Sequence, residues 1–214
     1  HFSKACRLGD GSSCAHLANL YQKGKGGEAS LPQAIALLRK SCQRKYGNGC
    51  SKLGSLYAKG LGVSKNLRTA FHLHRKACKL FSPDGCHQIG NLWETGFRGV
   101  PKNPSKAMAY HHRACLLGQS SSCNSVGTLY SKGTKGKKQK SKAVFWYRKA
   151  CKMKSGLGCF NLGDLYRFGQ WVKKNKKIAH RLYLRSCALR SGKGCNILEV
   201  MYRSGYNVKK SFKR

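Results

Sequence analysis

Acidic side chains are the scarcest chemistry in this chain of 214 residues. Six Asp and Glu residues stand against 43 Lys and Arg residues, and the formal net charge is +37. The six acids are scattered along the sequence, at Asp10, Glu28, Asp84, Glu94, Asp164 and Glu199. Nothing places any two of them together, so general acid–base catalysis by paired carboxylates has few candidates.

Several motifs of catalysis and membrane insertion are also missing. No apolar run reaches the 18 or more residues that a transmembrane helix needs. No serine is followed by lysine three residues later, which excludes the Ser-x-x-Lys motif of serine β-lactamases and penicillin-binding proteins. Neither H-E-x-x-H nor the G-x-x-x-x-G-K-[ST] phosphate loop occurs. The chain begins without a signal peptide, as expected of a mature or trimmed form. We expect no catalytic residue, no cofactor and no metal site.

Cysteine, in contrast, is abundant and strictly periodic. In each of six pairs the second cysteine follows the first by eight residues, and successive pairs are 36 residues apart with one step of 37. This register predicts an array of one repeated unit, and a period of this length indicates a solenoid. The pairs are Cys6/Cys14, Cys42/Cys50, Cys78/Cys86, Cys115/Cys123, Cys151/Cys159 and Cys187/Cys195.

Each unit is predicted to be a hairpin of two helices. In the third unit, apolar residues from Leu67 to Cys78 recur at steps of three and four, which is the stripe of an amphipathic helix. Turn-forming residues interrupt the pattern at 81–85, and a second stripe runs from Cys86 to Trp93. Gly96 stands where a helix C-cap needs a positive φ. The small residues Ala70 and Gly90 indicate close helix crossings.

The cysteines of a pair lie near the end of one predicted helix and the start of the next. Across a tight turn these positions can come within disulfide reach. Structural zinc sites space their cysteines by two to four residues, whereas here the spacing is C-x7-C and no histidine column accompanies it. The sequence favours a disulfide in each pair over free thiols or a metal, and cysteines in even pairs favour an oxidising compartment.

The units resemble a known repeat family. Lys76-Ala77-Cys78, Gly85-Cys86, Leu92-Trp93 and Gly96 are similar to Sel1-like repeats, which are relatives of the tetratricopeptide repeat. The cysteine pairs resemble those of the Helicobacter cysteine-rich proteins, a secreted bacterial family. The resemblance implies an all-α fold, a right-handed α-solenoid of about six hairpins, each closed by a disulfide.

The same resemblance supplies two alternative functions. Some of the bacterial relatives are described as penicillin-binding or weakly β-lactamase-like, which makes a hydrolase of that type the enzyme alternative. A mitochondrial intermembrane-space assembly factor of animals has related cysteine-paired repeats, which makes such a factor the second alternative.

The whole chain, 1–214, is expected to form a single repeat domain and a monomer. A solenoid lengthens its core with each repeat, so this length suffices. The expected repeats are 1–26, which is partial, then 27–62, 63–98, 99–135, 136–171 and 172–207, with 208–214 as the start of a further unit or a tail.

Basic residues follow the repeat. A column two residues before each first cysteine holds Lys4, Lys40, Lys76, Arg113, Lys149 and Arg185, and two loops add Lys135, Lys137, Lys138, Lys140, Lys173, Lys174, Lys176 and Lys177. Such a surface would bind a polyanion with counterion release, and a solvated face without a ligand is the alternative. Glycosaminoglycans, lipopolysaccharide and anionic lipid headgroups fit an oxidising compartment better than nucleic acid does.

The sequence therefore predicts a secreted or periplasmic scaffold that binds a protein or peptide partner. Curved repeat arrays usually bind on their concave surface, which the first helices of the hairpins would line. The candidate groove residues are His72, Tyr110, Trp146 and Tyr183. His74 and His111 occupy a packing position that Leu38, Tyr147 and Tyr183 fill in other units, so we expect them to lie in the core or line the groove.

Overall fold

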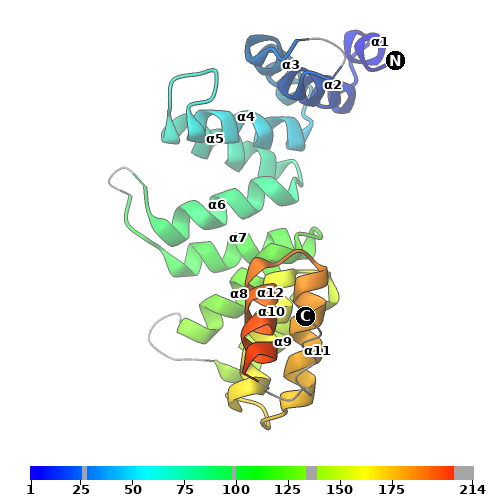
Figure 1. Cartoon of the computed structure of the whole chain (residues 1–214). Helices are drawn as coiled ribbons and strands as arrows, with labels where there is room; N and C mark the ends of the chain where they lie inside the picture. The colour runs from blue at the N-terminus through cyan, green and yellow to red at the C-terminus, as the bar shows by residue number, and fades with distance from the viewer. Residues whose placement is uncertain (26–27, 98–99, 134–138, 205–214) are drawn as a thin grey trace, which may run out of the picture. The chain divides into compact units, whose positions relative to one another are not determined.

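The structure is a computed structural model that describes residues 1–25, 28–97, 100–133 and 139–204. Over these residues the chain forms α-helices and no strand, as predicted (Figure 1). The chain divides into two compact units, His1–Leu117 and Gly118–Arg214. The prediction of a single domain over 1–214 and of its repeat boundaries stays a prediction.

The first unit holds seven helices and the second holds five within the described residues. In the first unit they are α1 Phe2–Arg7, α2 Gly11–Lys23, α3 Leu31–Gln43, α4 Gly47–Lys59, α5 Leu67–Lys79, α6 Pro83–Thr95 and α7 Pro104–Leu116. In the second unit they are α8 Ser120–Lys132, α9 Lys140–Lys152, α10 Gly156–Phe168, α11 Lys176–Ala188 and α12 Gly192–Arg203. No helix in the described ranges is long and apolar enough to cross a membrane.

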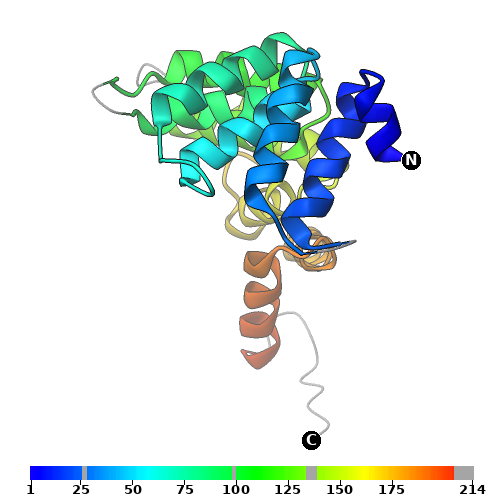
Figure 2. The same cartoon turned by 90° about the horizontal axis from the view of Figure 1, so that it is seen from above.

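Each helix pair folds back into a hairpin, and neighbouring hairpins stack. Within the first unit α3 packs on α4 and α5 on α6, while the contacts between hairpins join α2 with α3, α4 with α5 and α6 with α7. Figure 2 shows the helices of this unit, coloured blue to green, side by side. In the second unit α9 packs on α10 and α11 on α12, and α10 also packs on α11. Neither helix of a hairpin could bury its apolar stripe without these neighbours.

Side-chain caps fix where the helices begin. At the start of α5 the Asn66 side chain accepts a hydrogen bond from the Thr69 backbone N–H, at 3.0 Å. At the start of α6 the Ser82 hydroxyl accepts from the Gly85 N–H, at 3.2 Å. Each cap satisfies a backbone donor that has no partner inside the helix.

The turn inside each hairpin depends on one residue in the left-handed region. It stands three residues after the first cysteine, where Phe81 has φ 57° and Lys154 has φ 64°. Gly9, Lys45, Gly118 and Arg190 occupy the same position and also have positive φ. Left-handed backbone costs a non-glycine residue about 1 to 2 kcal/mol. Sequence reasoning saw a turn here but missed this conformation, because most of the side chains are not glycine.

The predicted disulfides are confirmed. In the first unit Cys6–Cys14, Cys42–Cys50 and Cys78–Cys86 are bonded, and in the second unit Cys151–Cys159 and Cys187–Cys195 are bonded. Their Cα atoms are 4.5 to 4.7 Å apart, within normal disulfide reach. Cys115 and Cys123 are disulfide-bonded as well, so none of the twelve cysteines, all of which the structure describes, is free.

The stacking of hairpins depends on rings packed against glycines. His111 of α7 lies on Gly90 of α6, where an added Cβ would come within 2.6 Å of the imidazole. His74 packs in the same way on Gly54. In the second unit Tyr147 lies on Gly127 and Tyr183 on Gly163, with Cβ distances of 2.7 Å in both cases. His74 and His111 are 2% and 0% exposed, so this position belongs to the core.

Candidate functional site

The basic column has a structural role that the sequence analysis did not consider. All six of its residues lie in the last turn of the first helix of a hairpin: Lys4, Lys40, Lys76, Arg113, Lys149 and Arg185. A cation in the last turn interacts favourably with the helix dipole, by about 0.3 to 1 kcal/mol at an exposed site. The column therefore stabilises the helices whether or not it binds a polyanion.

The loop lysines have no comparable explanation. Lys140, Lys176 and Lys177 lie in the first turn of α9 or α11, where the helix dipole disfavours a cation. Lys173 and Lys174 precede α11, and all five side chains are exposed. Lys135, Lys137 and Lys138 lie outside the described residues, as do 208–214. Polyanion binding by these lysines stays a prediction.

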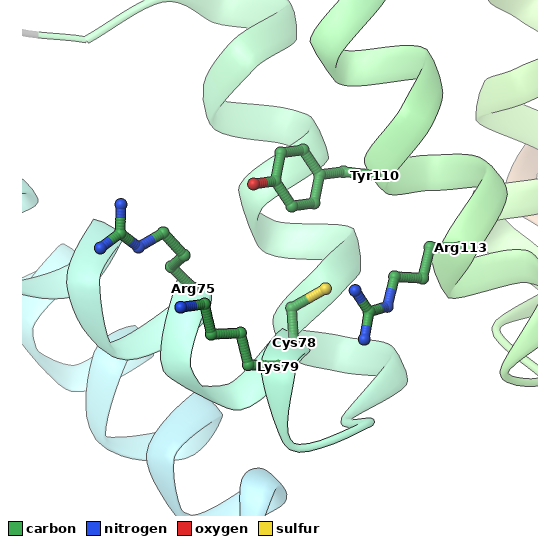
Figure 3. A pocket seen from close by; sticks show the side chains of 5 residues that line it. All are labelled: Arg75, Cys78, Lys79, Tyr110 and Arg113. Atoms are coloured by element: carbon green, nitrogen blue, oxygen red, sulfur yellow. The ribbon is translucent and has the colours of Figure 1, made fainter.

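A basic pocket lies between α5 and α7 in the first unit. Its lining residues are Arg75, Cys78 and Lys79 from α5, and Tyr110 and Arg113 from α7, around a volume of about 320 Å³. Figure 3 shows Arg75 and Lys79 on one side of the pocket and Arg113 on the other, with the Tyr110 ring reaching in from α7. Both helices are first helices of their hairpins, and these helices were expected to line the partner-binding surface.

The floor of the pocket is rigid. Tyr110 packs on a buried cluster made by the Cys78–Cys86 disulfide and Ala114. Cys78 is 1% exposed and Ala114 is 0% exposed. The disulfide joins α5 to α6, and α6 packs on α7, so both walls of the pocket are fixed to the same helix.

The positive charge in the pocket is not compensated. No acid lines it, and neither Arg75 nor Lys79 has a hydrogen bond or ion pair anywhere in the described ranges. Arg113 lies over the exposed ring of Phe81, with its Cζ 5.5 Å from the ring centroid, a cation–π arrangement. Three cations around one cavity create a positive potential that favours an anionic group.

Three acids of the chain form hydrogen bonds or ion pairs elsewhere. Asp10 accepts hydrogen bonds from the Ser13 hydroxyl and from the Ser13 and Ser12 N–H groups at the start of α2, and these bonds lower its pKa. Asp164 accepts from the Tyr183 hydroxyl at 2.6 Å, and burial raises the pKa of both groups. Glu199 pairs with Arg203 on the surface of α12, at 2.7 Å.

Two of the predicted site residues meet in the pocket. Tyr110 was expected to line the groove and Arg113 to bind polyanions, and both line this cavity. His72 is exposed on α5 and its ring contacts Phe71 edge-on. Trp146 is 8% exposed, and Tyr183 is fully buried with its hydroxyl bonded to Asp164, so these two side chains pack mainly in the core.

Sequence reasoning missed Arg75 and Lys79. The signal that could have found them is their spacing, because residues four apart lie on one face of a helix. They stand at this spacing on either side of Cys78, three residues before it and one after it. Among the described residues no group of three or more His, Cys, Asp and Glu could hold a metal ion.

The chain belongs to the Sel1 repeat family. The family model, described as Sel1 repeat, matches residues 11–46, 47–80, 83–119, 120–155 and 156–191. These stretches begin at the second helix of one hairpin and run through the first helix of the next, so they cut the same array half a repeat away from the boundaries proposed above. The search of the curated proteins found no match.

Solved structures support the same assignment. The chain is 25% identical to a Sel1 repeat protein from Oxalobacter formigenes, with a TM-score of 0.88 over 95% of this chain and 83% of that one. A protective antigen of uropathogenic Escherichia coli is 25% identical, with a TM-score of 0.84 over 98% of this chain and 45% of that one. Cysteine-rich protein B of Helicobacter pylori is 32% identical, with a TM-score of 0.50 over 64% of this chain and 98% of that one.

These findings confirm the predicted fold class, an α-solenoid of Sel1-like hairpins with a disulfide in every repeat. Sel1 repeats typically mediate interactions between proteins, so the chain is a repeat scaffold of that kind. The disulfides and the similarity to the Helicobacter protein are consistent with a location outside the cytoplasm.

Proposed function

We propose that this chain is a secreted or periplasmic scaffold that binds an extended, acidic segment of a partner protein along its first helices. The observation that carries the proposal is the pocket between α5 and α7, where three cations and a tyrosine hydroxyl surround a cavity without an acid. A segment lying across the first helices would place one anionic side chain in this pocket. The segment would also pass the exposed cations of the neighbouring turns, such as Lys76.

The charge of the chain supports an acidic partner. A net charge of +37 speeds the encounter with an acidic chain and repels a basic one. At physiological salt the Debye length is about 8 Å, so cations on the outer surface contribute little to the bound state. Arg75, Lys79 and Arg113 are exposed as well, but they surround one cavity, so an anionic group bound there lies close to all three at once. We therefore expect the pocket to dominate affinity and the remaining charge to dominate the association rate.

Binding of an acidic peptide tests this proposal. The probe is a fluorescent peptide of alternating Glu and Gly, titrated with the protein at 50, 150 and 500 mM NaCl. We expect the affinity to fall with salt, and the double variant Arg75→Gln/Arg113→Gln to bind about ten-fold or more weakly at 150 mM NaCl. The matched control is Lys173→Gln/Lys177→Gln, which removes the same charge from exposed positions and should change affinity less than three-fold.

Three outcomes would overturn the proposal. Equal weakening by both double variants would mean that net charge, and not the pocket, drives binding. No binding of the peptide at 50 mM NaCl would remove the acidic partner. If the chain does not bind the peptide but is retained tightly on a heparin column, the result would instead favour a sulfated polysaccharide as the ligand.

A further inference from the structure

One aromatic position differs between the third repeat and the others, in the hairpin that contributes one wall of the pocket. Seven residues after the second cysteine the chain has Tyr21, Tyr57, Trp93, Tyr130, Tyr166 and Tyr202. Tryptophan therefore replaces tyrosine only in the hairpin that contributes α5 and α6. The consequence of the change is found in the hydrogen bonds of the other repeats.

In two repeats the tyrosine of this column accepts a hydrogen bond from an arginine of its own hairpin. Arg39 Nη2 donates to the Tyr57 hydroxyl at 3.0 Å, and Arg148 Nη2 donates to the Tyr166 hydroxyl at 3.4 Å. Donor and acceptor are 18 residues apart in both pairs. In each case the arginine stands three residues before the first cysteine, on the first helix of the hairpin.

Arg75 is the same arginine in the third repeat, and it has lost its acceptor. Its equivalent partner is Trp93, 18 residues later, and an indole N–H can donate but not accept a hydrogen bond. Trp93 is held instead by its own neighbours: Lys106 Nζ lies 4.3 Å from its ring centroid, and Phe71 meets it edge-on at 5.9 Å. Among the described residues Arg75 therefore has no hydrogen bond or ion pair, and it lines the pocket.

We propose that Trp93 frees Arg75 so that Arg75, Lys79, Arg113 and the Tyr110 hydroxyl together bind a tetrahedral oxyanion, a phosphate or sulfate monoester carried by the partner. The proposal deepens the function proposed above, on which it rests for the existence of a partner. It assigns Trp93 as the residue that sets the specificity of the pocket through the side chain that it releases.

The donors of the pocket suit a tetrahedral ester better than a carboxylate. Two guanidinium groups, one ammonium group and one hydroxyl offer many more N–H and O–H donors than the four lone-pair sites of a carboxylate can accept. A phosphate monoester has three terminal oxygens and a charge of about −1.5 to −2, and forked guanidinium groups bind it in a bidentate manner. Three cations without an acid also exceed what one carboxylate would neutralise.

The second unit contains a natural comparison for this pocket. At the positions equivalent to Arg75, Lys79, Tyr110 and Arg113 it has Arg148, Lys152, Leu182 and Arg185. The three cations are kept, but Arg148 is bonded to Tyr166 and leucine replaces the tyrosine hydroxyl. If cationic charge alone made the site, this second set would bind oxyanions as well as the first.

The test uses inorganic phosphate and inorganic sulfate as probes, titrated into the full chain and followed by NMR of the arginine Nε–Hε signals. We expect the Arg75 signal to shift with saturation and the Arg148 signal to shift far less. Trp93→Tyr restores the acceptor for Arg75 and should weaken phosphate binding about ten-fold. Tyr166→Phe is the mirror variant, which releases Arg148 and should strengthen the response of that signal without changing Arg75.

The Trp93→Tyr variant is expected to fold, because five other repeats have tyrosine at this position. Circular dichroism and the thermal midpoint check this directly. Tyr110→Phe provides a second variant that leaves the packing of the ring intact and removes one donor. Unchanged phosphate affinity in both variants, or equal shifts of Arg75 and Arg148 in the parent chain, would overturn the inference.

Peptides then separate this inference from the proposed function. Three versions of one sequence carry phosphoserine, sulfotyrosine or glutamate at the central position, and the first two identify which ester the pocket prefers. If the glutamate peptide binds as tightly as both esters, the oxyanion inference fails while the acidic partner survives. If free phosphate binds at Arg75 but no peptide binds, the proposed function fails and the anion site stands.

Discussion

Reduction of the disulfides is expected to unfold this chain at room temperature in low salt. Each bond closes a loop of about nine residues, for which the chain-entropy model gives roughly 2.5 kcal/mol. Six such loops give about 15 kcal/mol as an upper bound, comparable to the whole stability of a typical domain, about 5 to 15 kcal/mol. A net charge of +37 adds self-repulsion that the reduced chain has to overcome. Far-UV circular dichroism, recorded on heating with and without reductant, measures the effect.

The charge predicts how the reduced chain responds to salt. Sodium chloride at 0.5 M screens the repulsion, so it should restore part of the helical signal in the reduced chain and change the oxidised chain little.

The double variant Cys78→Ser/Cys86→Ser removes a single disulfide loop and should lower the free energy of unfolding by about 2.5 kcal/mol, with lost amide protection confined to α5 and α6. An unchanged midpoint after alkylation of all twelve thiols would contradict this use of the cysteines.

Acid is expected to destabilise the first unit through two buried histidines. Burial lowers the pKa of His74 and of His111 to about 4, from an ordinary value near 6.5. A folded-state pKa below the unfolded value means that the unfolded chain binds more protons at low pH. The contribution of each neutral histidine to the free energy of unfolding is therefore complete above pH 6.5, and it is lost as the pH falls towards 4. The expected loss is about 2.5 kcal/mol per histidine between pH 7.5 and 4.5.

The environment of the two imidazole rings explains why the pKa of each is lowered. His74 Nδ1 and both ring nitrogens of His111 are buried and have no hydrogen bond to any residue that the structure describes. Glu94 Oε2 is 3.6 Å from His111 Nε2, too far for a hydrogen bond, and the charge of His87, whose ring lies 5.2 Å away, lowers the pKa of His111 further. Protonation would place a charge in the core, against the α-helix that each ring packs on, and Glu94 would be the ion-pair partner of a charged His111.

The repeat itself supplies the substitutions for this test. His74→Leu and His111→Tyr introduce side chains that occupy the equivalent positions 38 and 147, so each should fold. Urea unfolding at pH 7.5, 5.5 and 4.5 should show a shallower loss of stability in each variant and the shallowest loss in the double variant. His72→Leu, at an exposed site on α5, is the control and should follow the parent chain. Identical pH profiles in all four variants would rule out these histidines.

The repeat, the hairpins and the disulfides were predictable because the same cysteine spacing and the same apolar stripes recur in every unit. One helix with an apolar stripe is ambiguous, but the same stripe at a fixed distance from Cys42, Cys78 and Cys151 is not. The pocket was only half predictable, since Tyr110 and Arg113 stand in visible columns. Arg75 could not be assigned to the pocket from the sequence. The equivalent arginines donate hydrogen bonds to the hydroxyls of Tyr57 and Tyr166, and Trp93 offers no such acceptor to Arg75.

Burial of Tyr183 illustrates a second limit. Its position in the first helix of a repeat is compatible with a groove or with a core, and the side chain is amphipathic enough for both. The structure places its ring on Gly163 and its hydroxyl on Asp164, both of the preceding hairpin. Which neighbour a side chain meets is a property of the stack, and a single repeat read alone does not contain it.

The ring-on-glycine contacts have a consequence for how such an array can change its length. The ring belongs to one hairpin and its glycine to the hairpin before it, as with His111 and Gly90. Duplication or deletion of one whole repeat therefore places a ring on a glycine again and preserves the packing between neighbouring hairpins. The contact between the first and second hairpins is different. Leu38 of the second hairpin stands at the ring position, and Ala18 of the first hairpin stands at the glycine position. A hairpin bearing a tyrosine or histidine ring would collide if grafted after that alanine, so only a hairpin with a side chain such as Leu38 at this position can follow the first hairpin.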